Sequence, residues 1–285
     1  MPAKILLCLD SDPQPSVFDA VVAVDSGVDH LLRHGGVTPA DVEGLVHGAM
    51  FTRAPDQLQN TALFIGGSDV AAGEELLAAA AECFFGPMRV SVLLDSNGCN
   101  TTAAAAVLAA SRHAELGDKP TATVLGSGPV GQRIALLLAG EGVRVQVASR
   151  KQARAREVCE RLADHVDGSL LEAVGRDQKP VAAILSGGDL LFSAGPAGVE
   201  MVTADELAAA SPRVAIDLNA APPLGIGGIE VTDKAVDRSG CVSYGAIGVG
   251  GTKMKIHRAA IARLFETNDA VLDAAEVYEL GKAIG

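Results

Sequence analysis

The stretch TATVLGSGPVG, residues 121–131, reads as an apolar strand, a glycine-rich turn and the beginning of a helix. Gly126 permits the sharp turn, Gly128 lets a ligand approach the backbone, and Gly131 lets the helix lie close to the sheet. The N-terminus of such a helix offers unpaired N–H groups and a positive dipole end to phosphate. The stretch therefore predicts a dinucleotide pyrophosphate site formed by Gly126, Ser127, Gly128, Pro129, Val130 and Gly131.

The end of the next strand indicates which dinucleotide binds. It follows Gly126 at close to the ~20-residue spacing at which an NAD-binding chain places Asp or Glu for the ribose hydroxyls. This chain instead has Ser149, Arg150 and Lys151, and a guanidinium can hold a 2′-phosphate that a carboxylate would repel. We expect NADP, with some use of NAD left open. The alternative is that Arg150 and Lys151 only begin a solvated helix.

Strands and helices alternate on both sides of this turn, which is typical of mostly parallel α/β sheets. A chain of 285 residues favours two domains, and the polar stretch 116–120 is the best boundary. We expect an α/β fold of two α/β domains with a cleft between them: residues 1–117, on which 253–285 packs, and a Rossmann-type domain, residues 118–252. The predicted strands are 4–9, 62–65, 90–94, 121–125, 143–148, 182–185, 190–193 and 213–218. The predicted helices are 17–23, 71–81, 101–114 and 130–139, with one or two more within 253–284.

The composition argues against several classes of protein. The formal charge is −12 and the Lys and Arg residues are scattered, so we expect no nucleic-acid partner. No apolar run reaches membrane-spanning length and none resembles a signal peptide, so we expect a cytoplasmic protein without membrane contact. The five cysteines show no CxxC spacing, and Asp10 with Asp12 lacks a third ligand, so neither a disulfide framework nor a metal site is expected.

A polar peptide, DSNGCNTT at residues 95–102, follows the predicted strand 90–94 and leads into an alanine-rich helix. Ligands of α/β sheets bind at the carboxyl ends of strands, and a simple capped turn needs only one or two polar side chains. The peptide therefore predicts substrate contacts from Asp95, Asn97, Thr101 and Thr102.

Two further glycine-rich segments belong to the second domain. Residues 217–228 leave a strand, and residues 245–253 form a loop before the last helical segment. Such loops bring backbone close to a flat ligand, so we expect them to face nicotinamide, although hinges would use glycine in the same way. The residues expected to contact the cofactor from this half are Ser193, Ala194, Gly195, Asp217, Asn219 and Ile247.

Several peptides in order carry a resemblance to a known family: Asp12, 15–19, 71–74, 84–87, 95–98, 100–102, 126–131, 222–229, Lys253 with 257–259, and 264–266. With them the sequence closely resembles the bacterial NAD(P)-dependent methylene-tetrahydromethanopterin dehydrogenases of one-carbon metabolism. The resemblance implies that N5,N10-methylene-tetrahydromethanopterin is oxidised to the methenyl cation, with hydride delivered to NADP, as a step in formaldehyde oxidation. It also implies a homo-oligomer, with a trimer and a hexamer both open.

The resemblance further implies that the pterin lies on the first domain and the nicotinamide on the second. By position, Lys253 is the lysine near the pterin and the reacting carbon, with Asp95 and Thr102 beside it. The remaining substrate residues are Ser16, Asp19 and His257, although a lone histidine is more often a surface or helix-end group. Because the product is a cation, a charged Lys253 would oppose it, so the lysine is either neutral there or bonded to a pterin acceptor.

The chemistry explains why no general base stands out. The reacting carbon lies between two nitrogens whose lone pairs favour departure of the hydride. Alignment of this carbon with the nicotinamide and exclusion of water therefore suffice for the reaction. Three other functions stay open: a methylene-tetrahydrofolate dehydrogenase, which shares the pterin chemistry; an NADP-binding regulatory protein without turnover; and a relative of the amino-acid dehydrogenases, which would need an additional Lys/Asp pair.

Overall fold

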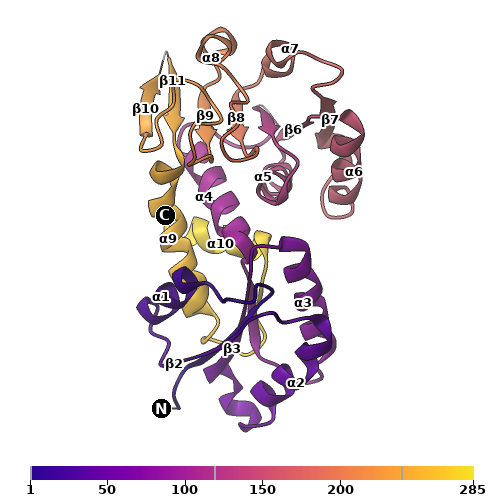
Figure 1. Cartoon of the computed structure of the whole chain (residues 1–285), viewed down its shortest axis with the longest axis vertical. Coiled ribbons are helices and arrows are strands. Elements are labelled where there is room, and N and C mark those ends of the chain that lie inside the picture. The colour runs from indigo at the N-terminus through magenta and orange to yellow at the C-terminus, as the bar shows by residue number, and fades with distance from the viewer. Residues whose placement is uncertain (1, 119, 239) are drawn as a thin grey trace. The chain divides into compact units, whose positions relative to one another are not determined.

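The computed structural model describes residues 2–118, 120–238 and 240–285 and divides into two compact units, each built on one sheet (Figure 1). Unit 1 runs up to Thr101 and includes Met254–Gly285, while unit 2 is Thr102–Lys253. Both boundaries between the units fall inside helices, one in α4 (Cys99–Ser111) and one in α9 (Ala246–Arg263). Each of these helices therefore contributes residues to both units.

The sheet of unit 1 has the strand order β12-β4-β3-β1-β2, and its paired strands are parallel. The edge strand β2 was not predicted, because its sequence HLLRH is largely exposed and lacks an apolar run. The strands are β1 (Ile5–Asp10), β2 (His30–His34), β3 (Thr61–Gly66), β4 (Ser91–Leu94) and β12 (Val271–Leu272).

Polar residues start the helices of unit 1. The Ser16 Oγ accepts a hydrogen bond from the Asp19 N–H at 3.2 Å, Thr38 and Asp41 form a reciprocal capping box, and Asp69 caps the next helix. The helices are α1 (Val17–Asp25), α2 (Pro39–Met50), α3 (Val70–Glu82) and α10 (Ala274–Ile284), with 3₁₀ segments at Pro55–Asn60 and Ser96–Gly98.

One face of the unit 1 sheet packs against α2 and α3. Leu9 and Leu63 project from neighbouring strands into a fully buried cluster with Val46 of α2 and Leu76 of α3. Burial of such side chains stabilises the fold by about 1.5–3 kcal/mol each. This cluster fixes α2 on the sheet.

The sheet of unit 2 has the order β10-β11-β9-β8-β5-β6-β7, parallel except for β10. Numbered from β5, the six parallel strands follow the Rossmann order 3-2-1-4-5-6, so the prediction of two α/β domains with a Rossmann-type second domain is confirmed. The strands are β5 (Thr121–Leu125), β6 (Arg144–Ser149), β7 (Leu171–Gly175), β8 (Leu190–Ser193), β9 (Val214–Asp217), β10 (Lys234–Arg238) and β11 (Cys241–Tyr244). The helices are α5 (Pro129–Gly140), α6 (Gln152–Leu162), α7 (Val181–Leu185) and α8 (Ala204–Ala210), with a 3₁₀ segment at Gly168–Leu170.

Two predictions for unit 2 were wrong. The predicted strand 182–185 is the helix α7, because a short apolar run after a proline suits either element and here buries Ile184 and Leu185. The predicted glycine loop 245–253 is instead the start of α9, which begins at Ala246. A Cβ on Gly248 would overlap the Asp233 carbonyl, so that glycine serves close packing of a helix.

Candidate dinucleotide and substrate sites

The three glycines of the turn after β5 have different surroundings. Gly126 has a φ of +120°, and a Cβ there would overlap the Ala194 carbonyl in the loop after β8. A Cβ on Gly131 would overlap the Gly126 carbonyl. By contrast, no atom of the described residues lies within 4 Å of the Cβ position of Gly128. The first and third glycines are needed for packing, and the second leaves space at the helix end.

The N-terminus of α5 fits a pyrophosphate. Gly128 is its N-cap and Pro129 its first residue, and no side chain of the described residues caps it. The N–H groups of the first helical turn and the positive end of the helix dipole therefore remain available to an anion. The residues of the turn can hold the phosphates of a dinucleotide.

Ser149 connects the turn to the end of β6. The hydroxyls of Ser127 and Ser149 are hydrogen-bonded at 3.0 Å, while Arg150 and Lys151 beyond them are exposed. The carboxylate of Asp177 lies near the same loop but accepts the Gln152 N–H at 3.0 Å, at the start of α6. Hydroxyl and cationic groups thus gather at the end of β6, a combination that can hold a phosphate group.

Sequence reasoning missed the residues that follow β7. Arg176 donates its N–H to the Ser149 carbonyl at 2.9 Å and its guanidinium reaches the Met201 sulfur at 3.5 Å. It lies at the carboxyl edge of the sheet beside the predicted ribose position, as does Asp177. The only signal in the sequence was a short apolar run that ends in Gly175 and is followed at once by charged residues.

The loops after β8 and β9 are held together by their own polar groups. Ser193 is fully buried, and the Asp217 carboxylate accepts the N–H groups of Asn219 at 3.1 Å and Ile226 at 3.0 Å. Burial raises the pKa of Asp217 above its ordinary value. A Cβ on Gly225 would overlap both the Ser193 hydroxyl and the Asp217 carboxylate. These side chains shape the loop from inside it.

The other residues predicted for the nicotinamide side lie at the same edge of the sheet. The Asn219 side chain bonds within its own loop: its Oδ1 accepts the Ala221 N–H and its Nδ2 donates to the Pro223 carbonyl. The Pro222–Pro223 peptide bond in the same loop is cis. Ala194 and Gly195 follow the carboxyl end of β8. Ile247 lies in the first turn of α9, just after β11, and its side chain is 62% exposed.

In unit 1, most of the peptide 95–102 folds upon itself. The buried Asp95 carboxylate accepts the N–H groups of Asn100 and Thr101 at 3.0 Å and the Thr101 hydroxyl at 2.7 Å. Asn97 adopts a left-handed conformation, with a φ of +53°, and is exposed, while Thr102 is half-buried. The expectation that a turn needs only one or two such residues was wrong, because this one uses several.

The remaining predicted substrate residues of unit 1 are close to one another. His257 is fully buried rather than at the surface or at a helix end, and its ring stacks on Phe64 at 5.8 Å between centroids. Its Nε2 lies 4.0 Å from the carboxylate of Asp19. Asp19 lies in the first turn of α1, the helix that Ser16 caps. Lys253, the last residue of unit 2, is half-buried and precedes His257 by one turn of α9.

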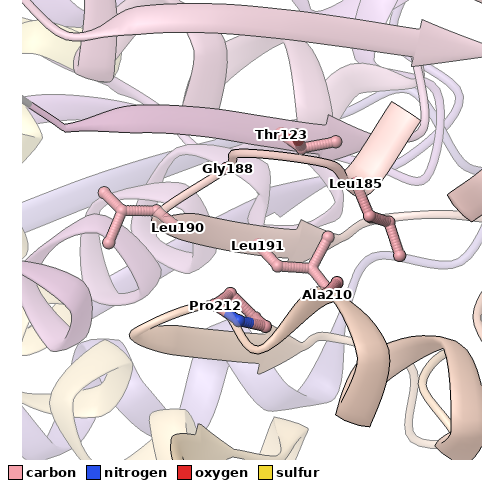
Figure 2. A pocket seen from close by; sticks show the side chains of 7 residues that line it. All are labelled: Thr123, Leu185, Gly188, Leu190, Leu191, Ala210 and Pro212. Carbon is pink, nitrogen blue, oxygen red and sulfur yellow. The ribbon is translucent and has the colours of Figure 1, made fainter. Parts of the chain in front are cut away.

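A small apolar hollow in unit 2 lies away from the turn after β5. Gly188 and Leu190 lie at the amino end of β8, and Pro212 precedes β9 (Figure 2). Since dinucleotides bind at the carboxyl edge of such sheets, this hollow is not the cofactor site. Its lining is Thr123, Leu185, Gly188, Leu190, Leu191, Ala210 and Pro212.

Three of the cysteines, Cys8, Cys159 and Cys241, show no nucleophilic character. Burial raises the pKa of Cys8 to about 12 and that of Cys159 to about 11, and it also raises the pKa of Cys241. These thiols are protonated at neutral pH, whereas a nucleophile must be a thiolate. In the described part of the chain, no three His, Cys, Asp or Glu side chains gather as a metal site, and no helix is long and apolar enough to cross a membrane.

Comparison with known proteins identifies the family. A family model described as methylene-tetrahydromethanopterin dehydrogenase, N-terminal, matches residues 17–97. The NAD(P)-dependent methylenetetrahydromethanopterin dehydrogenase of Methylorubrum extorquens is 31% identical over an alignment of 302 positions, covering 100% of this chain and 99% of the relative. The chain belongs to the methylene-tetrahydromethanopterin dehydrogenase family. The resemblance found in the sequence is confirmed.

Two further comparisons show how far the similarity to known proteins extends. The bifunctional protein MdtA of the same organism is 43% identical over 285 residues, covering 99% of each chain. Quinate dehydrogenase from Corynebacterium glutamicum, solved in complex with NAD, has a TM-score of 0.57 at 14% identity and covers 99% of each chain. The first supports descent over the whole length, and the second shows the fold alone.

Proposed function

We propose that this chain is an NAD(P)-dependent methylene-tetrahydromethanopterin dehydrogenase. It transfers hydride from N5,N10-methylene-tetrahydromethanopterin to NADP and releases the methenyl cation. The observation that carries the proposal is the 31% identity over the full length to a relative of that name. The open, uncapped helix end at Gly128 independently supports a dinucleotide site.

The residues of unit 2 fit the cofactor. The N–H groups at the start of α5 hold the pyrophosphate, while the Ser149 hydroxyl and the Arg150 guanidinium hold the 2′-phosphate. Bound NADP would supply the hydride acceptor. The end of β6 carries no carboxylate of the kind that holds the ribose in typical NAD sites, and the Asp177 carboxylate in the loop after β7 accepts the Gln152 N–H at 3.0 Å.

The residues of unit 1 provide a positioned surface for the pterin. The hydrogen bonds of Asp95 hold the start of α4, and the contacts of His257 hold α9 against β3, so the exposed Asn97 is presented from a rigid frame. The two nitrogens beside the reacting carbon drive hydride loss, so the chain must orient the substrate and exclude water, without abstracting a proton. We assign Lys253 to the reacting end of the pterin.

The assay that tests the function compares four pairs of reactants. Methylene-tetrahydromethanopterin and methylene-tetrahydrofolate are each mixed with NADP and with NAD, and reduced nicotinamide is followed by its absorbance. We expect the highest kcat/KM with the tetrahydromethanopterin carrier and NADP. Activity with neither carrier contradicts the assignment, and tight NADP binding without turnover would favour a regulatory protein.

A second activity is favoured by one observation, and methylene-tetrahydrofolate is the candidate substrate because it shares the pterin chemistry. The chain is 43% identical to a relative whose name describes it as bifunctional, against 31% for the relative named for tetrahydromethanopterin alone. The pterin chemistry of the two carriers is the same. The ratio of kcat/KM values for the two carriers in the same assay measures how far this chain acts on both.

The role of Lys253 is tested by Lys253→Met, which keeps the length of the side chain and removes its nitrogen. We expect a lower kcat with NADP affinity retained, because NADP is held from the turn after β5. Lys255→Met, two residues along α9 and exposed, is the matched control. Unchanged turnover in Lys253→Met would remove the lysine from the reaction.

We also infer that the enzyme is a cytoplasmic homo-oligomer. Its α1 exposes an apolar row, Val17, Val21 and Val24, each more than half exposed in the single chain. The adjacent strand β2 has an unpaired edge in the described sheet. Monomers rarely expose such continuous apolar surface, which is typical of subunit contacts. Light scattering of the wild type and of Val21→Glu tests this, and a monomeric wild type contradicts it.

A further inference from the structure

A groove in unit 1 runs between α2 and the edge of the sheet. Its floor is formed by Ile5, Leu7 and Leu32 of β1 and β2, and its helical wall by Gly44 and Gly48. We name it the α2 groove. Its volume is about 450 Å³, within the ~300–1,000 Å³ typical of small-molecule sites. The groove lies beside the amino-terminal half of β1, whereas the proposed pterin residues 95–102 follow the carboxyl end of β4.

The two glycines keep the groove open. Both lie inside α2, and apart from their chain neighbours and the helix's own backbone no atom of residues 2–118, 120–238 or 240–285 comes within 4 Å of where their Cβ atoms would be. Neither has a positive φ. Glycine destabilises a helix interior relative to alanine, and here neither backbone conformation nor packing requires it. The effect of both glycines is to leave space above Leu7 and Leu32.

One end of the groove is polar. Thr61 is 3% exposed, and its Oγ1 is buried with no hydrogen-bond partner in the described structure. Arg53 also lines the groove; its Nη2 donates to the Ala3 carbonyl at 2.8 Å, but its Nη1 is buried and likewise has no partner among the described residues. Buried donors without acceptors are costly, and natural structures rarely keep them.

The order of these groups along the groove indicates the ligand. Thr61 pairs with Ile5 in the sheet, while Leu32 pairs with Leu7 two residues further along β1. The guanidinium and the hydroxyl are therefore at the amino-terminal end, and apolar side chains and glycines continue from there. A guanidinium with a free N–H matches an oxyanion, and the apolar floor matches a hydrocarbon tail.

We propose that the α2 groove binds a small amphiphilic carboxylate. Its carboxylate oxygens accept hydrogen bonds from Arg53 Nη1 and Thr61 Oγ1, and its tail lies over Leu7 and Leu32 against Gly44 and Gly48. Occupation satisfies both buried donors and covers the apolar floor. The proposal does not depend on the dehydrogenase activity, since no residue of the groove belongs to the proposed pterin or NADP sites.

The test titrates butanoate, hexanoate and octanoate into the full-length protein by calorimetry, with 1-octanol as the uncharged probe. We expect one site, with affinity rising along the carboxylate series, and octanol bound at least about tenfold more weakly than octanoate, as expected for loss of one charge-assisted hydrogen bond. If none of the three carboxylates binds, the proposal is wrong.

Two variants locate the site. Gly48→Leu fills the groove and should abolish octanoate binding while keeping or raising the unfolding temperature, because leucine favours a helix. Gly140→Leu, at an exposed helical glycine of α5 that also has open space, is the matched control and should bind normally. Octanoate binding unchanged in Gly48→Leu would place the ligand elsewhere and overturn the proposal.

Arg53→Met tests the carboxylate. It should weaken octanoate about tenfold and leave octanol unchanged, and Arg53→Lys, which keeps the charge, should retain part of the affinity. Equal binding of octanol and octanoate to the wild type would show a merely apolar groove. Sedimentation gives the last outcome: if Gly48→Leu dissociates an oligomer that octanoate does not affect, the occupant is a second copy of the chain, and the small-molecule proposal is rejected.

Discussion

Two helices of the molecule follow the same kind of turn but differ in whether the N–H groups at their N-termini are occupied. Both α4, which begins in unit 1 and continues into unit 2, and α5 in unit 2 follow a buried parallel strand through a glycine-containing turn. At α4 the Asp95 carboxylate accepts the first N–H groups of the helix, whereas at α5 the N-cap is Gly128 and the N–H groups stay available. A carboxylate at a helix start occupies the place where an anion would bind. The comparison therefore supports the proposed cofactor site at α5 and indicates a scaffolding role for the turn before α4.

The largest effect is expected when α5 is given the carboxylate that α4 has. Gly128 has an extended backbone conformation that aspartate adopts, and space for a side chain, so Gly128→Asp should fold and cap the helix. The added charge should weaken NADP binding about 100- to 1,000-fold, because it competes for the N–H groups and repels pyrophosphate. Fluorescence titration of NADPH measures this, with Gly140→Asp as the control. Wild-type affinity in Gly128→Asp would show that the pyrophosphate is bound elsewhere.

The converse change removes the carboxylate from the start of α4. Asp95→Ala leaves the buried N–H groups of Asn100 and Thr101 without an acceptor, so the free energy of unfolding should fall by about 2–4 kcal/mol. Urea unfolding measures the loss, and NADP affinity should change little. An Asp95→Ala protein that is as stable as the wild type but inactive would point to a direct role of Asp95 with the substrate.

The proposed preference for NADP is assigned to cations beyond the α5 turn. Arg150→Ala should weaken NADP about 10- to 100-fold and leave NAD unchanged, because only the 2′-phosphate meets the guanidinium. The matched control is Arg154→Ala, since Arg154 is exposed on α6 and bonds Glu157 at 3.0 Å. Equal losses for NADP and NAD in Arg150→Ala would mean that the arginine supports the fold or the pyrophosphate.

The smallest effect concerns the pH dependence of the loop after β9. Burial raises the pKa of Asp217, so the folded state holds this proton more tightly than the unfolded state does. The associated stability is fully present below the unfolded pKa and is lost as pH rises through the folded pKa. Asp217→Asn lacks this dependence, so the difference in unfolding free energy should shift in favour of the variant from pH 3.5 to pH 6. A shift in the other direction would show that hydrogen bonds to the carboxylate outweigh its burial.

Features that sterics dictate could be predicted from the sequence. The turn 126–131 is an example, because Gly126 and Gly131 each lie against backbone that excludes a Cβ. The same holds for the cap at Ser16, whose hydroxyl has a fixed local partner. The Rossmann-type architecture of the second domain followed from that turn and from the alternation of strands and helices.

Features that depend on distant partners could not be predicted. Whether Asp95 bonds a substrate or its own helix depends on atoms that only the folded turn brings together. The run 182–185 is apolar enough for a strand or a helix, and β2 has no apolar signal because it lies at an edge. His257 reads as a surface group until Phe64, far away in the chain, covers it.

The central claim is that the chain moves a hydride from the methylene carbon of tetrahydromethanopterin to NADP. The most direct measurement is the stoichiometry of products when methylene-tetrahydromethanopterin carrying two deuterium atoms on the methylene carbon is mixed with enzyme and excess NADP. The account predicts one methenyl product for each NADPH formed, with one deuterium of each pair on the nicotinamide ring and the other retained on the methenyl carbon. Loss of the transferred deuterium to water, or no NADPH at all, would contradict it.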